Sequence, residues 1–437
     1  MASDVQPLSG TIDIDSEAAP TIERDRLYRL WEEGNWSAKA LDFAQDAVDW
    51  RERLDDQQRR AVLWSYASFL DGEESVTVTL APFVQAAPRA EDKIFLATQI
   101  ADEARHHVFF DRWLREVAGI GTDLTSTLRA TQPDLTWGYH QVFNELDHVS
   151  DLLRRRPNEP PLLAQGVALY HMVIEGMLAH TGQHFFRESG KKQGYFPGFE
   201  NGIAHVQRDE SRHIAFGIQL LRELVTNDPA CKRAAIAMLN RALPWATGAL
   251  TPPDLDWSYI DGFDAGYTHL DVFAFGIRSI EQKLPRAGIA PGEVAALVKL
   301  GHTDPPLRQA ERAVALIEGH VVGTDAPPCP TEATMDAIFD GVRHLAAWTQ
   351  PRHPDLRATI QWVFDGAAPR YLTLGAGEPT VATGTAAQPT LTLACAASDW
   401  ALLAGGRLDQ RRALLTRRLR VSGDWGLALR LGDVLPV

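Results

Sequence analysis

The sequence has few cysteines and no long apolar run. Its 437 residues include only three cysteines, which are far apart and form no CxxC pair, so we expect neither a zinc knuckle nor a disulfide framework. No stretch approaches about 18 uninterrupted apolar residues, which predicts no membrane span. The segment Met1–Pro20 is polar and acidic and lacks the features of a signal peptide. We therefore expect a cytoplasmic protein.

Basic residues are also in short supply. The chain holds 43 Lys and Arg against 57 Asp and Glu, for a net charge of −14. A field of this sign disfavours nucleic acid as a partner. Residues 331–437 contain 11 Arg, no Lys and 10 acids, so the acid excess lies in residues 1–330. Carboxylates in that part of the chain are available as metal ligands.

The hydrophobic pattern predicts a mainly α protein with an α+β part at the C-terminus. Residues 1–21 have little periodicity and are expected to form a flexible N-terminal arm. In residues 22–322 apolar residues recur at spacings of three and four, which is typical of helices, for example in Asp56–Gly72 and Glu91–Val117. The segment Gln193–Gly202, QGYFPGFENG, is expected to be a loop.

The sequence pattern changes after residue 322. Residues 323–331 contain three prolines and are expected to be a linker. Residues 332–437 then predict an α+β domain of about 105 residues. Its expected elements are helices at Glu332–Thr349, Ser398–Ala404 and Asp409–Thr416, and strands at Thr359–Phe364, Arg370–Leu374, Thr390–Ala394 and Leu419–Ser422.

An internal duplication carries the chemistry. Residues 102–107 read DEARHH and residues 209–214 read DESRHI, so D-E-x-R-H occurs twice. A Glu and a His three apart lie on one face of a helix, about one turn apart, and can bind the same metal ion. Two such pairs, with one further Glu from each of two other helices, make a di-metal carboxylate site in a four-helix bundle. The pattern nominates Glu103, His106, Glu210 and His213.

The two additional carboxylates are sought upstream. Glu175 interrupts an otherwise apolar helix face, where an unpaired buried carboxylate would be costly. Glu73 is the other candidate, although Glu74 competes with it on spacing alone. A lone ExxH, Glu145 to His148, is the kind of match that chance supplies, and we expect it to bind no metal.

Two aspartates precede the paired ligands. Asp102 and Asp209 are each placed to accept a hydrogen bond from the histidine of the opposite helix, with surface ion pairing as the alternative. The predicted ligand set is four Glu and two His without a thiolate, which suits iron or manganese better than copper(I) or structural zinc. A pair of such metal ions is suited to activating dioxygen.

Residues 25–285 resemble the ribonucleotide reductase small-subunit superfamily, whose bundle is ferritin-like. The first helix carries the resemblance, in Leu27-Tyr-Arg-Leu-Trp-Glu-Glu, Trp36 and Asp42-Phe. A classical subunit has a radical-forming tyrosine four residues after the first ligand histidine, where this chain has Phe110. That subunit also ends in a flexible tail, where this chain continues into a folded domain. Both departures argue against nucleotide reduction and favour the ligand-binding oxidase branch.

Resemblance to that branch implies specific properties. The cofactor is a manganese–iron pair, or two irons, with dioxygen as oxidant. One metal is assigned Glu73, Glu103 and His106, and the other Glu175, Glu210 and His213, with Glu103 or Glu210 bridging. The ligand is a long-chain fatty acid held against the metals. An ether cross-link is implied between Val76 and Tyr170, and their presence favours Glu73 over Glu74. We also expect a homodimer.

Residues 332–437 resemble a sterol carrier protein type 2 domain. The matching residues are Leu391-Thr-Leu, Ser398-Asp-Trp, Leu403-Ala-Gly-Gly-Arg-Leu-Asp and Arg418-Leu-Arg-Val-Ser-Gly-Asp. Such domains enclose an apolar tunnel for lipids or acyl chains, although some copies serve only in dimerisation or packing.

The leading hypothesis is an oxygen-activating di-metal oxidase acting on a fatty-acid or lipid-like substrate, which the C-terminal domain binds or presents. One alternative is a lipid carrier or sensor whose metal site oxidises only itself. Another is an N-oxygenase of a biosynthetic pathway, and a nucleotide reductase radical subunit is disfavoured by Phe110. Substrate turnover and product analysis separate these.

Overall fold

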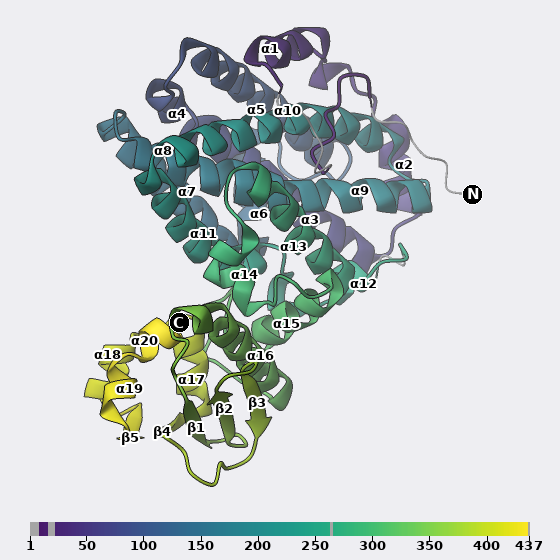
Figure 1. Ribbon diagram of the computed structural model, residues 1–437. Helices are drawn as coiled ribbons and strands as arrows, with labels where there is room; N and C mark the ends of the chain where they lie inside the picture. The colour runs from purple at the N-terminus through teal and green to yellow at the C-terminus, as the bar shows by residue number, and fades with distance from the viewer. Residues whose placement is uncertain (1–7, 16–21, 263–264, 436–437) are drawn as a thin grey trace. The chain divides into compact units, whose positions relative to one another are not determined.

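The computed structural model describes residues 8–15, 22–262 and 265–435 (Figure 1). The chain divides into two compact units, Met1–Ala290 and Pro291–Val437. The first unit is helical. Its elements are α1 (Arg24–Glu33), η1 (Ala38–Ala40), α2 (Ala44–Glu52), α3 (Asp56–Thr79), α4 (Ala81–Ala86), α5 (Ala90–Glu116), α6 (Leu124–Thr131), η2 (Gln132–Asp134), α7 (Trp137–Arg155), α8 (Pro160–Val167), η3 (Ala168–Ala179), α9 (His180–Gln193), α10 (Pro197–Asn227), α11 (Pro229–Ala249), η4 (Pro253–Leu255), α12 (Ser258–Asp261) and α13 (His269–Arg286).

Four long helical stretches form the centre of this unit: α3, α5, α10 and the continuous run from α8 through η3 to α9. Helix α3 begins in a capping box, in which Asp55 accepts from the amide of Gln58 and the Gln58 side chain accepts from the amide of Asp55. The middle of the continuous run, η3, is a π-helix of 12 residues. Helices α3 and α5 pack together, and α10 packs against η3. The bundle is ferritin-like.

The expected loop at Gln193–Gly202 is mostly helix, which corrects the prediction. Only three residues separate α9 from α10, and α10 begins at Pro197. Asp46 of α2 accepts hydrogen bonds from the amides of Gly198 and Phe199, both at 2.8 Å. These amides are free at a helix start, and proline suits the first helical position. The cap comes from about 150 residues away in the chain, so local composition did not reveal it.

The described part of the N-terminal arm, residues 8–15, is packed against the helices, contrary to the expected flexible arm. The amide of Ile12 donates to Ser211 Oγ at 3.0 Å, and Ile14 is buried. Lys283 of α13 donates to Asp15 at 3.2 Å. The rest of the predicted arm, residues 1–7 and 16–21, lies outside the described residues.

Within the described chain, one helical stretch, Pro160–Gln193, is long and apolar enough to cross a membrane by length and composition. Its most apolar window has a mean hydropathy of 1.4 and is 83% buried inside the protein. The stretch is the α8–η3–α9 core run, and η3 carries the buried Glu175. Its apolar character is therefore explained by its place in the bundle core.

The second unit combines a mixed sheet with helices. The sheet order is β3-β2-β1-β4-β5, with β1 and β4 parallel and the other pairs antiparallel. The strands are β1 (Ala358–Asp365), β2 (Arg370–Leu374), β3 (Thr380–Thr383), β4 (Leu391–Ala396) and β5 (Arg420–Gly423). The helices are η5 (Pro291–Glu293), α14 (Ala295–Lys299), α15 (Pro306–Glu318), α16 (Glu332–Thr349), η6 (Gln350–Arg352), α17 (Ala397–Ala404), α18 (Gln410–Leu415), α19 (Trp425–Leu429) and α20 (Leu431–Val434).

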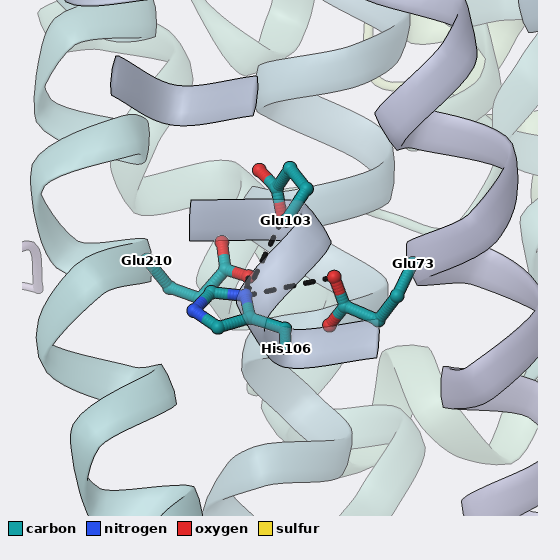
Figure 2. Close-up of side chains that lie close together, drawn as sticks. All are labelled: Glu73, Glu103, His106 and Glu210. Carbon is teal, nitrogen blue, oxygen red and sulfur yellow. Dashed lines mark ion pairs between the residues drawn. The ribbon is translucent and has the colours of Figure 1, made fainter. Parts of the chain in front are cut away.

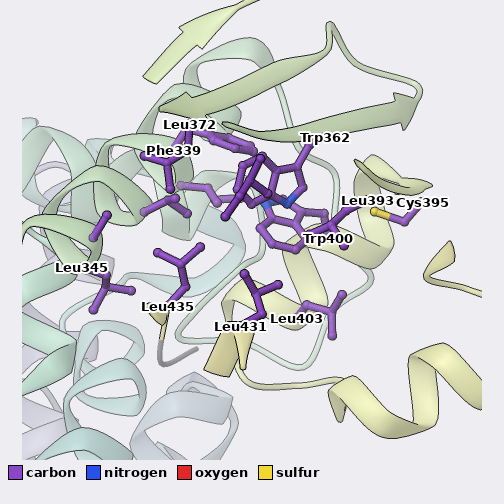
Figure 3. Packing of buried hydrophobic residues seen from close by; sticks show 14 of the residues in the cluster. Phe339, Leu345, Trp362, Leu372, Leu393, Cys395, Trp400, Leu403, Leu431 and Leu435 are labelled. Carbon is purple, nitrogen blue, oxygen red and sulfur yellow. The ribbon is translucent and has the colours of Figure 1, made fainter. Parts of the chain in front are cut away.

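Three aromatic rings pack together within the largely aliphatic core of this unit (Figure 3). Trp362 of β1 lies edge-on to Phe339 of α16 at 5.1 Å and to Trp400 of α17 at 5.5 Å between ring centroids. Strand β4 buries Leu391, Leu393 and Cys395, every second residue, which is the alternation of a sheet with one covered face. The predicted helix at Glu332–Thr349 and strand at Arg370–Leu374 have the observed bounds, whereas β3, α19 and α20 were not predicted.

The boundary between the units lies earlier than the predicted linker. Helices α14 and α15 both pack on α16, and Val298 and Val321 belong to the same apolar cluster as Trp362. Residues 291–322, which the hydrophobic pattern had grouped with the helical part at residues 22–322, thus share a core with the sheet. Periodicity identifies a helix but not the core against which it packs.

Candidate metal centre

Helices α3, α5, η3 and α10 each turn acidic or imidazole side chains toward one point in the bundle. They form two groups of four, and in each group one ligand atom per residue lies within 4.8 Å of the others. All the members are buried. The first group is Glu73, Glu103, His106 and Glu210, and the second is Glu103, Glu175, Glu210 and His213. The six residues nominated from the sequence are thereby brought together.

The first group is centred on His106 (Figure 2). Its Nδ1 lies 3.5 Å from Glu73 Oε2, 3.4 Å from Glu103 Oε2 and 3.7 Å from Glu210 Oε1. Figure 2 shows these carboxylates converging on the imidazole from different helices. Glu74 is exposed and belongs to neither group, so the structure separates the two candidates that spacing left open.

The second group repeats this arrangement around His213. Its Nδ1 lies 3.2 Å from Glu103 Oε1, 3.4 Å from Glu175 Oε1 and 3.6 Å from Glu210 Oε2. Glu103 and Glu210 therefore present one oxygen to each histidine. This is the geometry required of carboxylates that bridge two ions.

Several buried atoms of the centre have no hydrogen-bond partner among the described residues: His106 Nδ1, His213 Nδ1, Glu175 Oε2 and Glu210 Oε2. Unpaired buried polar atoms are costly in a folded protein. Metal ions would satisfy all four, and oxygen and imidazole nitrogen donors suit iron or manganese. The donor set thus fits a pair of such ions.

Burial and mutual repulsion shift the ionisation of these groups. Burial raises the pKa of Glu175 to about 8, and the neighbouring Glu210 and Glu103 add to the rise. Burial raises the pKa of Glu73 well above its usual value, despite the opposing effect of His106. Burial alone would lower the pKa of His106, but Glu73, Asp209 and Glu103 raise it well above its usual value. The centre as a whole favours added positive charge.

Each histidine contacts an aspartate of the opposite helix through Nε2, the ring nitrogen that points away from the glutamates. His106 Nε2 lies 3.3 Å from Asp209 Oδ2, and His213 Nε2 lies 3.1 Å from Asp102 Oδ2. With Nε2 engaged, Nδ1 is left to face the carboxylates. This crossed pairing is the one that the sequence allowed for, and both aspartates are buried instead of lying in surface ion pairs.

The aspartates are themselves anchored by residues to which sequence reasoning gave no role. Arg212 Nη2 donates to Asp102 at 3.0 Å and to Asp209 at 2.8 Å, joining α5 and α10. The indoles of Trp31 and Trp36 donate to Asp102 at 3.0 Å and to Asp209 at 2.7 Å. The duplicated arginine of D-E-x-R-H was the available signal.

Tyr170 and Glu175 are linked by Gln99 of α5. The Gln99 amide donates to the Tyr170 hydroxyl at 3.1 Å and to Glu175 Oε1 at 2.7 Å. Both residues lie on η3, where the π-helical i to i+5 hydrogen bond places residues five apart about one turn apart on a similar face of the helix. In an α-helix this spacing is about 1.4 turns. The π-helix, which periodicity did not predict, explains how both side chains reach Gln99.

The remaining predicted positions are placed as follows. Val76 is buried on α3 and borders the same cavity as Tyr170 and Glu73. Phe110 is fully buried among aromatic side chains, with its ring 5.3 Å from that of Phe69. His148 is exposed and belongs to neither metal-binding group. Its sequence partner Glu145 forms an ion pair with Arg241 at 2.6 Å.

A cavity of about 180 Å³ leads from the centre into the bundle. One end is bordered by Glu73, Glu103, Glu175 and Glu210. Its walls are mainly apolar and include Phe69, Ile174, Leu178 and Phe186. The centre therefore adjoins a space suited to an apolar chain.

A third cluster, Asp304, Asp340 and His344 in the second unit, also has metal-compatible spacing. Arg312 already contacts both of its carboxylates, with Asp304 at 2.7 Å, and Arg343 donates to Asp340 at 2.6 Å. Two arginines neutralise the two acids, so we assign no metal to this cluster.

Comparison with known proteins agrees with this geometry. The family model described as "Ribonucleotide reductase, small chain" matches residues 21–243. The model described as "SCP-2 sterol transfer family" matches residues 339–436 and identifies the C-terminal domain.

Similar solved structures include R2-like ligand-binding oxidases. One with an aerobically reconstituted Mn/Fe cofactor is 28% identical, with a TM-score of 0.52 over 61% of this chain and 92% of that one. A mutant with the same cofactor is 27% identical, with a TM-score of 0.53 over 61% and 94%. The oxidase from Sulfolobus acidocaldarius is 24% identical, with a TM-score of 0.52 over 62% and 93%, and supports the fold. The chain belongs to the ribonucleotide reductase small-chain family and carries an SCP-2 domain at its C-terminus.

Proposed function

We propose that the first unit is an oxygen-activating di-metal oxidase that acts on a bound fatty-acid or lipid-like substrate. The observation that carries this proposal is the sharing of Glu103 and Glu210 between two histidine-centred groups at one end of an apolar cavity. A two-ion site opening onto bulk water would favour small polar substrates. Here the cavity beside the centre is lined mainly by apolar side chains, which suits an apolar chain.

One ion would be held by Glu73 and His106, the other by Glu175 and His213, with Glu103 and Glu210 bridging. The similar solved structures that contain Mn/Fe support manganese and iron as the pair, with two irons as the alternative. When bound, the ions supply electrons for the reduction of dioxygen. Asp102 and Asp209 fix the imidazole orientation by engaging Nε2, which leaves each Nδ1 free to bind an ion when one is present.

The cavity favours an acyl chain with its carboxylate at the metals. A carboxylate is an oxygen ligand of the same kind as the four glutamates, and the chain would contact Phe69, Ile174 and Leu178. Burying each methylene contributes about 0.8 kcal/mol. A long-chain fatty acid therefore combines metal coordination with apolar burial.

A self-catalysed ether cross-link between Val76 and Tyr170 is part of the proposal. Both residues are buried and border the same cavity beside Glu73 and Glu103. Joining the valine Cβ to the phenol oxygen breaks one C–H and one O–H bond. The two hydrogens leave as protons and the two electrons pass to dioxygen. Glu103, which accepts the phenol hydrogen bond at 2.7 Å, is placed to receive the phenol proton.

The C-terminal unit is proposed to bind or present the lipid-like substrate. The match to the SCP-2 sterol transfer family over residues 339–436 supports this role. The alternative roles are dimerisation and a carrier or sensor function for the whole chain. We further propose a cytoplasmic homodimer.

The deciding experiment is reconstitution of the metal-free full chain with manganese and iron in air. Dioxygen uptake is measured with and without a long-chain fatty acid, and the acid is recovered and analysed by mass spectrometry. We expect uptake beyond one turnover and an oxidised acid. A single uptake event with unchanged acid would reject the oxidase and favour a carrier or sensor. An oxidised amine product from an added amine would instead identify an N-oxygenase.

A further inference from the structure

The cavity has a second polar region, remote from the metal centre, that the proposed oxidase chemistry does not use. It is bordered by Tyr195, Glu200, Ser189 and Tyr267. Tyr195 lies in the short connection between α9 and α10, and Glu200 lies in the first turn of α10. Glu200 precedes Glu210 by ten residues, which is about 15 Å along the helix axis. The cavity thus joins a metal end and a distal polar end.

The Tyr195 hydroxyl is a hydrogen-bond donor that has no acceptor among the described residues. The side chain is 8% exposed, and its hydroxyl is buried with no hydrogen-bond partner among the described residues. Its ring is held by Arg53, whose guanidinium lies 5.7 Å from the ring centroid and donates to the backbone oxygens of Gln193 and Gly194. An unpaired buried hydroxyl on a residue that lines the cavity is available as a hydrogen-bond donor for a ligand.

Glu200, which lines the same cavity, provides an acceptor. The absence of a side chain at Gly190 lets the carboxyl group approach the α9 backbone, because a Cβ there would lie 2.0 Å from Glu200 Oε1. Of the nearby cations, Arg187 donates to Gln207 and Lys191 pairs with Glu188, both at 2.8 Å, while the buried Arg187 Nε has no hydrogen-bond partner among the described residues. Burial raises the pKa of Glu200 to about 7, so its carboxyl group is in part protonated at neutral pH.

We propose that Tyr195 and Glu200 bind a hydroxyl group at the far end of the substrate chain, so that the substrate class is an omega-hydroxy acyl chain. This inference rests on the proposed oxidase function, which places the other end of the chain at the metals. The ligand hydroxyl accepts from Tyr195 and donates to Glu200. An ionised terminal carboxylate has no hydrogen to donate to Glu200, and a terminal ammonium has no lone pair with which to accept from Tyr195.

The test uses the full chain, both metal-loaded and metal-free, and isothermal titration calorimetry with dodecanoic acid and its omega-hydroxy derivative. We expect the hydroxy acid to bind about tenfold more tightly, as two added hydrogen bonds allow. Tyr195→Phe and Glu200→Met should each remove most of this preference while binding of dodecanoic acid is unchanged, because neither phenylalanine nor methionine offers a comparable hydrogen-bonding group. Tyr195→Phe breaks no existing hydrogen bond among the described residues, so it should fold normally. Tyr259→Phe, at another cavity tyrosine, is the matched control and should keep the preference.

Equal affinity for the two acids, no binding of either, or a preference that survives both variants would overturn the proposal. Dioxygen uptake is measured separately on the same preparations. Uptake and oxidation of plain fatty acids without a hydroxyl preference would reject this site and leave the oxidase intact. A hydroxyl preference without uptake would reject the oxidase and leave the site.

Discussion

The hydroxyl of Tyr170 donates a 2.7 Å hydrogen bond to Glu103, one of the two carboxylates that face both histidines of the centre. Burial raises the pKa of this phenol well above its usual value, and the charges of Glu103 and Glu175 raise it further. The phenol therefore stays protonated until an oxidant removes its hydrogen. Because the phenol lies beside the centre, we expect its oxidation to depend on the bound metals.

Tyr170→Phe is expected to abolish the cross-link with Val76. Wild-type protein reconstituted with manganese and iron in air should yield a joined peptide lighter by two hydrogens than the two linear peptides together. The variant should yield only linear peptides and lose about 1 kcal/mol of stability with the hydrogen bond. Tyr139→Phe, at a cavity tyrosine that instead donates to the Ser68 carbonyl, should retain the joined peptide. Linear peptides alone from wild-type protein that has consumed dioxygen would contradict the cross-link.

Metal stoichiometry provides a second prediction. His106→Ala and His213→Ala should each lower the bound metal from about two ions per chain to about one, because each histidine belongs to one group. Metal analysis after gel filtration measures this, with circular dichroism to confirm folding. His148→Ala is the control, since His148 is exposed and lies in neither group. Two ions retained in the double variant would refute the assignment.

The sequence predicted the parts of this site that depend on spacing within one helix, and missed the parts that depend on how helices pack against one another. Repetition of D-E-x-R-H predicted four converging side chains, because spacing within one helix determines which residues share a face. Glu73 could not be chosen over Glu74 by spacing, since that choice depends on which face of α3 meets α5. The π-helix was missed because apolar periodicity in a fully buried helix carries little phase information.

Long-range contacts account for the other differences. The start of α10 is capped by Asp46, and the boundary at Ala290 reflects the packing of α14 and α15 on α16. Neither contact can be detected in the local composition of the segment that it stabilises. The predicted bounds of α16 and β2 were right because a capping threonine and a short alternating run mark them locally.

Gly217→Ala should be strongly destabilising. A Cβ at Gly217 of α10 would lie 2.2 Å from the Cβ of His171 on η3, an atom that cannot move without the backbone. We expect a loss of about 2 kcal/mol or more, because overpacking a core forces main-chain shifts. Chemical denaturation measures this on the metal-free chain. Gly119→Ala, with no neighbour within 4 Å but a positive φ, separates backbone strain from the clash. An unchanged unfolding midpoint for Gly217→Ala would show that α10 and η3 are further apart.

The unit boundary predicts a difference between two truncated chains. Residues 291–437 should unfold cooperatively, whereas residues 332–437 should be less stable because Val298 and Val321 are lost from the core. Removing two buried valines costs several kcal/mol at about 1.5–3 kcal/mol each. Thermal unfolding followed by circular dichroism compares them. Equal melting temperatures would return the boundary to the linker at residues 323–331.

Glu200→Gln should stabilise the protein, and only at neutral and higher pH. The folded-state pKa of about 7 lies above the ordinary value of 4.5, so the folded chain holds a proton that the unfolded chain releases. Stability therefore falls as pH rises from about 4.5 to about 7, and Gln, which cannot ionise, escapes this loss. The side chain is partly exposed and lies near Arg187, Lys191, Glu188 and Asp46, so we expect a gain of at most about 2 kcal/mol near pH 8 and none near pH 4. Urea unfolding at both pH values measures the difference. The control is Glu188→Gln. Lys191 lowers the pKa of the Glu188 carboxylate, so this variant should show no such gain. Parallel pH profiles for wild type and Glu200→Gln would mean that the carboxylate is solvated and that the distal end of the cavity is open to water.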